Sequence, residues 1–262
     1  MPSTGDVVIK RVAISLGVIV IVVGMLCTSA FAQTTVPPGA SVQLNGGSMN
    51  LAGTSLLDAG VFGIGSGAMI NILDASIAPG ASLVVGTGAM TLSRDWSNLG
   101  TFTAGSGAIN FIDGGVATSN ISGNSIFNNA SFISSTGKTY SFATGSTQTV
   151  GGALTILGAS TLGIQFKSAT LGQAANLNLL PGGTQNIDFV GVSSVHATGQ
   201  PLAPTKTNFG GSGDALGWFG AVVAAVAAIP APMLSMLGML LLCAVLIAAF
   251  ARHLRRVRSL TH

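Results

Sequence analysis

From residue 33 to about residue 198, short stretches of alternating apolar and polar residues are separated by Gly, Asn, Ser and Thr. Alternation with a period of two places one set of side chains on each face of a β-strand. One phrase recurs at spacings of 21 and 19 residues, as Gly65–Ile72, Gly86–Leu92 and Gly105–Phe111. A looser copy begins at Gly145, and the phrase at Pro38 returns at Pro79 after 41 residues, about two periods.

A period near 20 residues that contains strand-like alternation is typical of stacked β-coils, which share one core because a single coil cannot bury its own apolar face. We therefore predict an all-β fold in which residues 33–198 form a parallel β-solenoid (β-helix) of ~20-residue coils. Gly and Asn suit the corners, where positive φ is often needed. A β-sandwich or Greek-key barrel is the alternative, because short strands separated by turns are typical of those folds too.

The first 32 residues are typical of a secretory signal peptide. Lys10 and Arg11 close a positive segment, residues 12–26 are uncharged and apolar, and Ala30 and Ala32 form a small-x-small cleavage site. Cleavage by signal peptidase is expected to leave Gln33 as the first residue of the mature chain.

The last third of the chain changes composition twice. Residues 199–228 begin rich in Gly and Pro and then become apolar, which predicts a linker. After Pro230 and Pro232, the uncharged residues 233–251 are long enough to span a bilayer as a helix. Because basic residues stay on the cytoplasmic side, the following cluster is expected to stop transfer; its members are Arg252, Arg255, Arg256 and Arg258.

This C-terminal layout of a proline motif, one apolar helix and a basic tail resembles the IPTL-CTERM sorting signals, which belong with the PEP-CTERM class of Gram-negative bacteria. The resemblance covers residues 229–262, and Met236–Gly238 stands where Trp-Gly is common. It implies an exosortase-like transpeptidase as partner. It also implies an inner-membrane intermediate, followed by delivery to the cell surface, outer envelope or extracellular matrix. The residues that carry the motif are Ile229, Pro230, Ala231, Pro232, Leu234 and Ser235.

The repeats between Arg94 and Ala203 are similar to repeats of large bacterial surface and adhesin-like proteins. The similarity is carried by Trp96–Gly107, by the Phe-Asn-Asn strand at Phe127 and by the Gly-Ser-x-Gln-Thr-Val turn at Gly145. It implies a solenoid with an exported surface role, and no particular ligand.

Charge is scarce in the body of the chain. Only 6% of the 262 residues are charged, against about 25% in typical soluble domains. The body carries four cations (Arg94, Lys138, Lys167, Lys206) and six aspartates, so the pI near 9.2 belongs to the two ends. Four scattered cations cannot build a basic face, and we expect no nucleic-acid partner.

The sequence favours no catalytic, cofactor-binding or metal-ligating residue. The body has a single histidine, His196, which we interpret as structural, and both cysteines, Cys27 and Cys243, lie in the terminal segments. Asp74 with Asp95, or Asp95 with Asp113, lie about one coil apart and are candidates for a glycosidase-like carboxylate pair. We favour the interpretation that each aspartate caps a turn, and that Arg94 and Asp95 form a local ion pair or turn.

Two functions follow from these observations. The preferred one is an exported, non-enzymatic, structural or adhesin-like protein of the cell surface or extracellular matrix, with polysaccharide or copies of itself as partners. The alternative is a surface enzyme acting on polysaccharide through paired aspartates. Self-association is expected because the end of a solenoid exposes unpaired strand edges.

Overall fold

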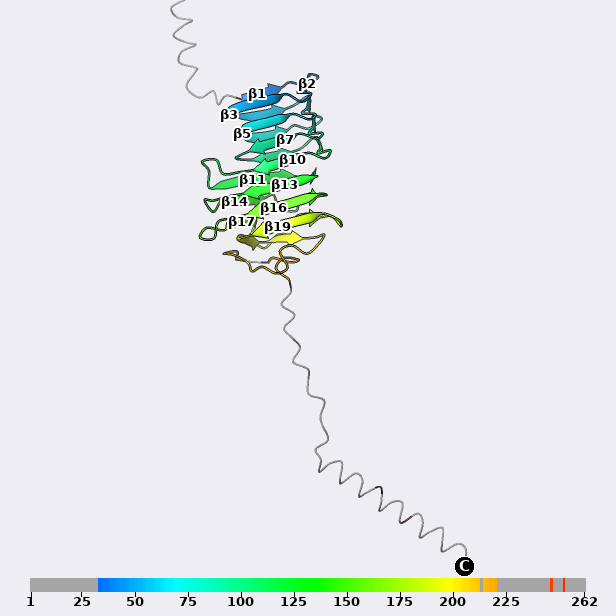
Figure 1. Ribbon diagram of the computed structural model, residues 1–262, viewed down its shortest axis with the longest axis vertical. Helices are drawn as coiled ribbons and strands as arrows, with labels where there is room; N and C mark the ends of the chain where they lie inside the picture. Colours follow the sequence, from blue (N-terminus) through cyan, green and yellow to red (C-terminus); the bar gives the residue numbers. More distant parts are fainter. Residues whose placement is uncertain (1–32, 213, 221–245, 247–251, 253–262) are drawn as a thin grey trace, which may run out of the picture. The chain divides into compact units, whose positions relative to one another are not determined.

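A computed structural model describes residues 33–212 and 214–220, together with the single residues 246 and 252. Its strands stack in chain order along one column (Figure 1). All strand pairs are parallel, and paired strands belong to successive coils. The body is therefore a β-solenoid of about eight turns, as predicted, because a sandwich would need antiparallel neighbours.

Each coil contributes strands to three faces. The first face contains β7 (Ala89–Leu92), β10 (Ala108–Phe111), β13 (Asn129–Ile133), β16 (Ala153–Leu157) and β19 (Thr184–Asp188). The second face contains β1 (Gln33–Val36), β8 (Trp96–Asn98), β11 (Thr118–Gly123), β14 (Thr139–Phe142), β17 (Ile164–Ser168) and β20 (Val190–Ser193). The long strands β3 (Ser48–Asp58) and β5 (Ala68–Ile77) run through both faces and join them into one 13-stranded sheet.

The third face is divided into two four-stranded sheets. One contains β2 (Ser41–Gln43), β4 (Val61–Gly63), β6 (Ser82–Val84) and β9 (Thr101–Thr103). The other contains β12 (Ser125–Phe127), β15 (Thr147–Val150), β18 (Ala175–Leu179) and β21 (Val195–Ala197). The break between β9 and β12 is the main departure from a regular stack.

The core changes character along the solenoid. In the first coils it is mainly aliphatic, with buried Leu56, Ile64 and Met69. From Trp96 onward aromatic rings join the aliphatic side chains, and these rings contact one another from coil to coil. The members of this aromatic column are Trp96, Phe111, Phe127, Phe132, Tyr140, Phe142, Phe166 and Trp218.

The repeated Gly-x-Gly phrase forms the corner between the third and first faces. Gly86 has a φ of +73°, and a Cβ placed on it would lie 2.6 Å from the carbonyl oxygen of Gly65 in the preceding coil. The second glycine has a different role: a Cβ on Gly88 would lie 2.2 Å from the carbonyl oxygen of Gly67. Both glycines are therefore required, the first by its φ and by space, the second by space alone.

The segment predicted as a linker is packed as far as residue 220. Leu202 and Trp218 are buried and form a parallel bridge with each other. The Asn208 side chain accepts from the N–H of Val192 and donates to its C=O, at 2.7 and 2.9 Å. Residues 199–212 and 214–220 thus close the edge of the last coil. The linker prediction was wrong here because Gly and Pro are as typical of tightly fitted loops as of free ones.

Replacing Trp218 with alanine is expected to release this terminal segment. The Trp218 ring ends the aromatic column against Phe166, at a centroid distance of 6.2 Å, so its loss leaves a void beneath the cap. We expect amide hydrogen exchange to accelerate at least tenfold in residues 199–220, with amides of β7 and β10 little changed. Leu216→Ala is the control, since Leu216 is 65% exposed, and equal effects of the two variants would contradict this role.

Several predicted features lie outside the described residues. These are the signal peptide with Ala30 and Ala32, the sorting motif at residues 229–235, and Arg255, Arg256 and Arg258. Gln33 is described as the first residue of β1, and Arg252 as a single exposed residue. Within the described residues, no helix has the length and apolar character needed to cross a bilayer.

Candidate functional site

The corner between the first and second faces gathers most of the charge of the body. Six of the ten charged residues between positions 33 and 220 lie there, and Lys206 reaches one of them, Asp188, at 2.9 Å. We call this edge of the solenoid the charged corner; its residues are Asp74, Arg94, Asp95, Asp113, Lys138 and Asp188.

Two aspartates of the charged corner bind the next coil. The Asp74 carboxylate accepts hydrogen bonds from the Asp95 N–H at 3.1 Å and from the Ser55 hydroxyl at 2.7 Å. The Asp95 carboxylate in turn accepts from the backbone N–H and the side-chain amide of Asn120, at 2.8 and 3.1 Å. Arg94 Nε lies 3.5 Å from Asp74, in the preceding coil, so its closest carboxylate partner is not the adjacent Asp95.

Lys138 is the least expected member of the corner, because its side chain is only 1% exposed. Its Nζ donates to the carbonyl oxygens of Ser93 and Ile112, and lies 5.4 Å from the ring centre of Tyr140. Burial lowers the pKa of Lys138, and the nearby carboxylates of Asp113 and Asp95 offset part of that effect. The ammonium group thus ties together three successive coils.

Asp113 fixes the turn that leads to Lys138. Its carboxylate accepts from the N–H and hydroxyl of Ser135, at 2.8 and 3.0 Å, and from the hydroxyl of Thr136 at 3.0 Å. Burial alone would raise the pKa of Asp113, but the hydrogen bonds from residues 134–136 outweigh it and the pKa lies below its ordinary value of 3.8.

The lowered pKa of Asp113 predicts a loss of stability in acid. A carboxylate with a depressed folded-state pKa contributes stability above its unfolded-state pKa, and that stability disappears as the pH falls through the folded-state pKa. Asp113→Asn should therefore cost about 1 kcal/mol at pH 6, since solvent screens this partly exposed site, and the difference should shrink as the pH falls through the folded-state pKa, which lies below 3.8. Chemical unfolding of both proteins across that range measures it. A difference that is independent of pH would contradict the assignment.

The predicted carboxylate pairs are partly brought together. Asp74 and Asp95 lie on adjacent coils and are linked through the Asp95 N–H. Asp113 lines a groove of about 210 Å³ that runs across the corner with Asn71, Thr91 and Ser93. Asp113 accepts hydrogen bonds from the turn at Ser135, whereas Asp74 and Asp95 accept theirs from Asp95 and Asn120 of the next coil.

The remaining ionisable residues with predicted roles lie elsewhere. His196 Nε2 is 2.6 Å from an Asp214 carboxylate oxygen at the far end of the solenoid. Asp58 is buried beside the corner between the second and third faces, where it accepts from the Gly60 N–H at 3.1 Å. Burial raises the pKa of Asp58, and the bond from Gly60 opposes that rise.

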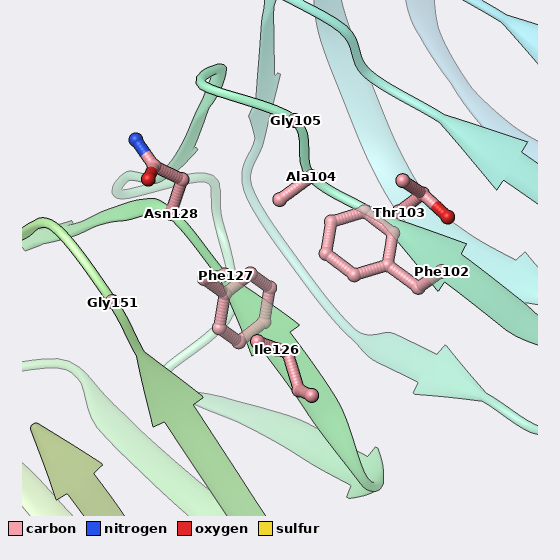
Figure 2. Close-up of a pocket in the computed structure, with 8 residues that line it drawn as sticks. All are labelled: Phe102, Thr103, Ala104, Gly105, Ile126, Phe127, Asn128 and Gly151. Atoms are coloured by element: carbon pink, nitrogen blue, oxygen red, sulfur yellow. The ribbon is translucent and has the colours of Figure 1, made fainter. Parts of the chain in front are cut away.

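A second candidate site occupies the break in the third face. A cleft of about 310 Å³ lies between β9 and β12. Figure 2 shows the side chains of Phe102 and Phe127 next to each other in its lining. These rings are 5.5 Å apart, and Ile126, which is 66% exposed, lies beside them. Asn128 and Thr103 add polar groups to the lining.

The strand edges that border the cleft have open backbone groups. Backbone groups of successive residues point alternately to the two neighbouring strands. Because Thr101 donates to Ala81 and Thr103 accepts from Val85, the N–H and C=O of Phe102 point away from β6. The C=O of Phe127 accepts from the N–H of Gly151 in the next coil. The N–H and C=O of Ile126 therefore point away from β15 and toward β9.

A buried polar network beside this cleft joins strands of the second face to the sheet that contains β12. Trp96 Nε1 donates to the Ser125 hydroxyl at 2.9 Å, and the Asn98 side chain donates to the carbonyl of Asn124 at 2.8 Å. The Gln148 side chain donates to the Gly123 carbonyl at 2.7 Å. Side chains of β8 therefore hold the start of β12 in place, although β12 does not pair with β9.

Comparison with known proteins adds no identification. No family model matches the chain, no curated protein is significantly similar to it, and no solved structure matches its fold significantly. The assignment of function therefore depends on the chemistry of the chain itself.

Two features were not predicted from the sequence. One is the role of buried Lys138 as a link between coils, and the other is the cleft between β9 and β12. Lys138 contacts carbonyls 45 and 26 residues earlier in the chain, and no local pattern indicates such contacts. One signal for the break was present: the Gly-x-Gly phrase ends at Gly107, and Asn128 and Asn129 occupy the corresponding corner of the next coil.

Proposed function

We propose that this chain is an exported, non-enzymatic, structural or adhesin-like protein of the cell surface or extracellular matrix. In this proposal signal peptidase removes residues 1–32, and an exosortase-like transpeptidase acts at the motif of residues 229–235 while the apolar helix and basic tail hold the chain in the inner membrane. Polysaccharide is the proposed partner of the body, and nucleic acid is not.

One observation supports the structural role most strongly. The charged side chains mainly join coils to one another, and the outward side of the first face carries a column of uncharged polar residues in register. This polar column consists of Thr91, Asn110, Ser131, Thr155 and Asn186. Hydroxyl and amide groups that repeat at the spacing between strands can form many weak hydrogen bonds to a polymer that lies along the column.

The cleft between β9 and β12 supports a polysaccharide partner. The partly exposed Phe102 and the exposed Ile126 offer apolar surface to the faces of sugar rings, and their open backbone groups suit hydroxyls. Ile126→Asp is therefore expected to weaken retention on matrix polysaccharide from the native cell at least fivefold. Ile133→Asp, at a 45% exposed isoleucine outside the cleft lining, is the control. Equal retention of both variants and the parent chain would exclude the cleft as the contact.

Export and sorting are tested by surface labelling of intact native cells. The full chain should react with a membrane-impermeant amine reagent, since Lys167 is exposed in the body. A chain in which Pro230 and Pro232 are both replaced by alanine keeps the apolar segment and the arginines, and should remain in the inner membrane unlabelled. Equal labelling of the two chains would contradict sorting at the proline motif.

The enzyme remains a second candidate because of one feature of the charged corner. Asp113 lines the groove at the charged corner together with Ser93 and Ile112, and the Lys138 ammonium group binds the carbonyl oxygens of those two residues. Release of reducing ends from a surface polysaccharide by the exported protein, abolished in both Asp95→Asn and Asp113→Asn, would replace the structural proposal. Equal release from parent and variants would come from a contaminant and would leave the structural proposal in place.

A further inference from the structure

The first coil leaves three strand edges open at one end of the solenoid. This coil consists of β1, β2 and the beginning of β3, and it lies at the blue end of the stack in Figure 1. Within residues 33–212 and 214–220, each of these strands pairs only with the following coil. The opposite end differs, because the segment up to residue 220 covers the last coil there.

The open edges carry backbone groups ready for pairing. Val36 accepts from Ala59, so the N–H and C=O of Thr35 point outward from β1. Ala40 accepts from Val61, so those of Ser41 point outward from β2 by the same alternation. Beneath these edges, three apolar side chains at the end of the core are only partly buried; they are Val42, Leu44 and Met49.

The edge also lacks charge, which is one of the usual protections against association. Natural proteins protect sheet edges with charges, prolines, bulges or covering segments. Residues 33–57 contain no Asp, Glu, Lys or Arg, whereas the opposite end has the Asp188–Lys206 pair and the His196–Asp214 pair. Two copies of this surface would therefore approach each other without charge repulsion.

We propose that two mature chains associate head to head through their first coils. The same surface of each chain would meet its copy across a two-fold axis, so that edge strands pair and the apolar ends of the two cores join. Because the other end is covered, this contact closes at two chains and does not propagate into a fibre. The proposal rests on the proposed cleavage before Gln33, which leaves no segment of the chain preceding β1.

The test uses the full exported chain purified in a density-matched detergent, with its N-terminus sequenced and its protein mass measured by sedimentation equilibrium. The wild type is expected to have twice the mass of one chain. Thr35→Lys with Ser41→Lys places charges on the exposed edge and should give the mass of a single chain. The control variant carries Ser76→Lys and Val61→Lys. Ser76 lies in line with Thr35, and Val61 in line with Ser41, but both belong to inner coils, so this variant should remain dimeric.

The outcomes separate this inference from the proposed function. A wild type that begins at Gln33 and stays monomeric at high concentration overturns head-to-head pairing and leaves the export proposal intact. A chain that keeps residues 1–32 overturns both. Dimers of the edge variant would place the contact elsewhere, and species larger than two would indicate head-to-tail stacking. Unchanged melting temperatures of both variants establish that the fold is retained.

Discussion

Replacing Phe132 with alanine is expected to lower the free energy of unfolding by about 3–5 kcal/mol. Phe132 is 1% exposed and lies at the centre of the aromatic column. Its ring stacks on Phe111 at 4.5 Å and meets Tyr140 and Phe166 edge-on, each at 5.1 Å. The substitution removes the buried ring and leaves a cavity between rigid coils, which cannot collapse without breaking the register of both neighbours.

Phe62→Ala is the matched control for this prediction. Phe62 is as deeply buried as Phe132, but it lies in the aliphatic coils, and no ring of the described residues contacts it. Since aromatic pairs contribute about 0.5–1.5 kcal/mol beyond their buried area, Phe132→Ala should cost at least about 1 kcal/mol more than Phe62→Ala. Chemical unfolding of both variants measures the difference. Equal costs would mean that the aromatic column packs no better than the aliphatic coils.

Gly86→Ala is expected to destabilise the solenoid by about 3 kcal/mol or more, because two effects act at one position. The left-handed conformation at φ +73° costs roughly 1–2 kcal/mol for a residue with a Cβ. In addition, that Cβ would lie 2.6 Å from the Gly65 carbonyl oxygen, so the backbone of two coils must separate.

Gly80→Ala isolates the first of these effects. Gly80 has a similar φ of +82°, but a Cβ placed there meets no atom within 4 Å. It should therefore cost only about 1–2 kcal/mol. Comparison of the two free energies of unfolding separates conformational strain from coil-to-coil contact. If Gly80→Ala proved as costly as Gly86→Ala, the close contact between coils would not be the reason why glycine is required at the Gly-x-Gly corner.

The solenoid could be predicted because the stacking itself imposes the repeats. Gly86 and Gly105 must be glycine at the same corner of successive coils, so the phrase recurs at the coil length. The alternation within each phrase is equally a direct consequence of one buried face. The terminal cap was not predictable in this way, since Leu202 and Trp218 meet the stack only once and repeat nothing.

The candidate sites were predictable only in part. Each aspartate was expected to cap a turn, and the carboxylates of Asp74 and Asp95 instead accept from backbone N–H groups of the next coil. The sequence pattern does not define how far each coil is displaced relative to its neighbour. It therefore could not show that these N–H groups belong to the next coil. The cleft arises from a missing pairing between β9 and β12, and the end of the Gly-x-Gly phrase at Gly107 marks the position of the break without indicating a cleft.

The most direct test of the proposed function is the intact mass of the protein recovered from the surface of its native cell, with mapping of both terminal peptides. A species that begins at Gln33 and ends near residues 229–232 is the result that export and sorting predict. A species that still contains residues 233–262 would mean that the C-terminal segment is a permanent membrane anchor, and it would contradict processing at the proline motif.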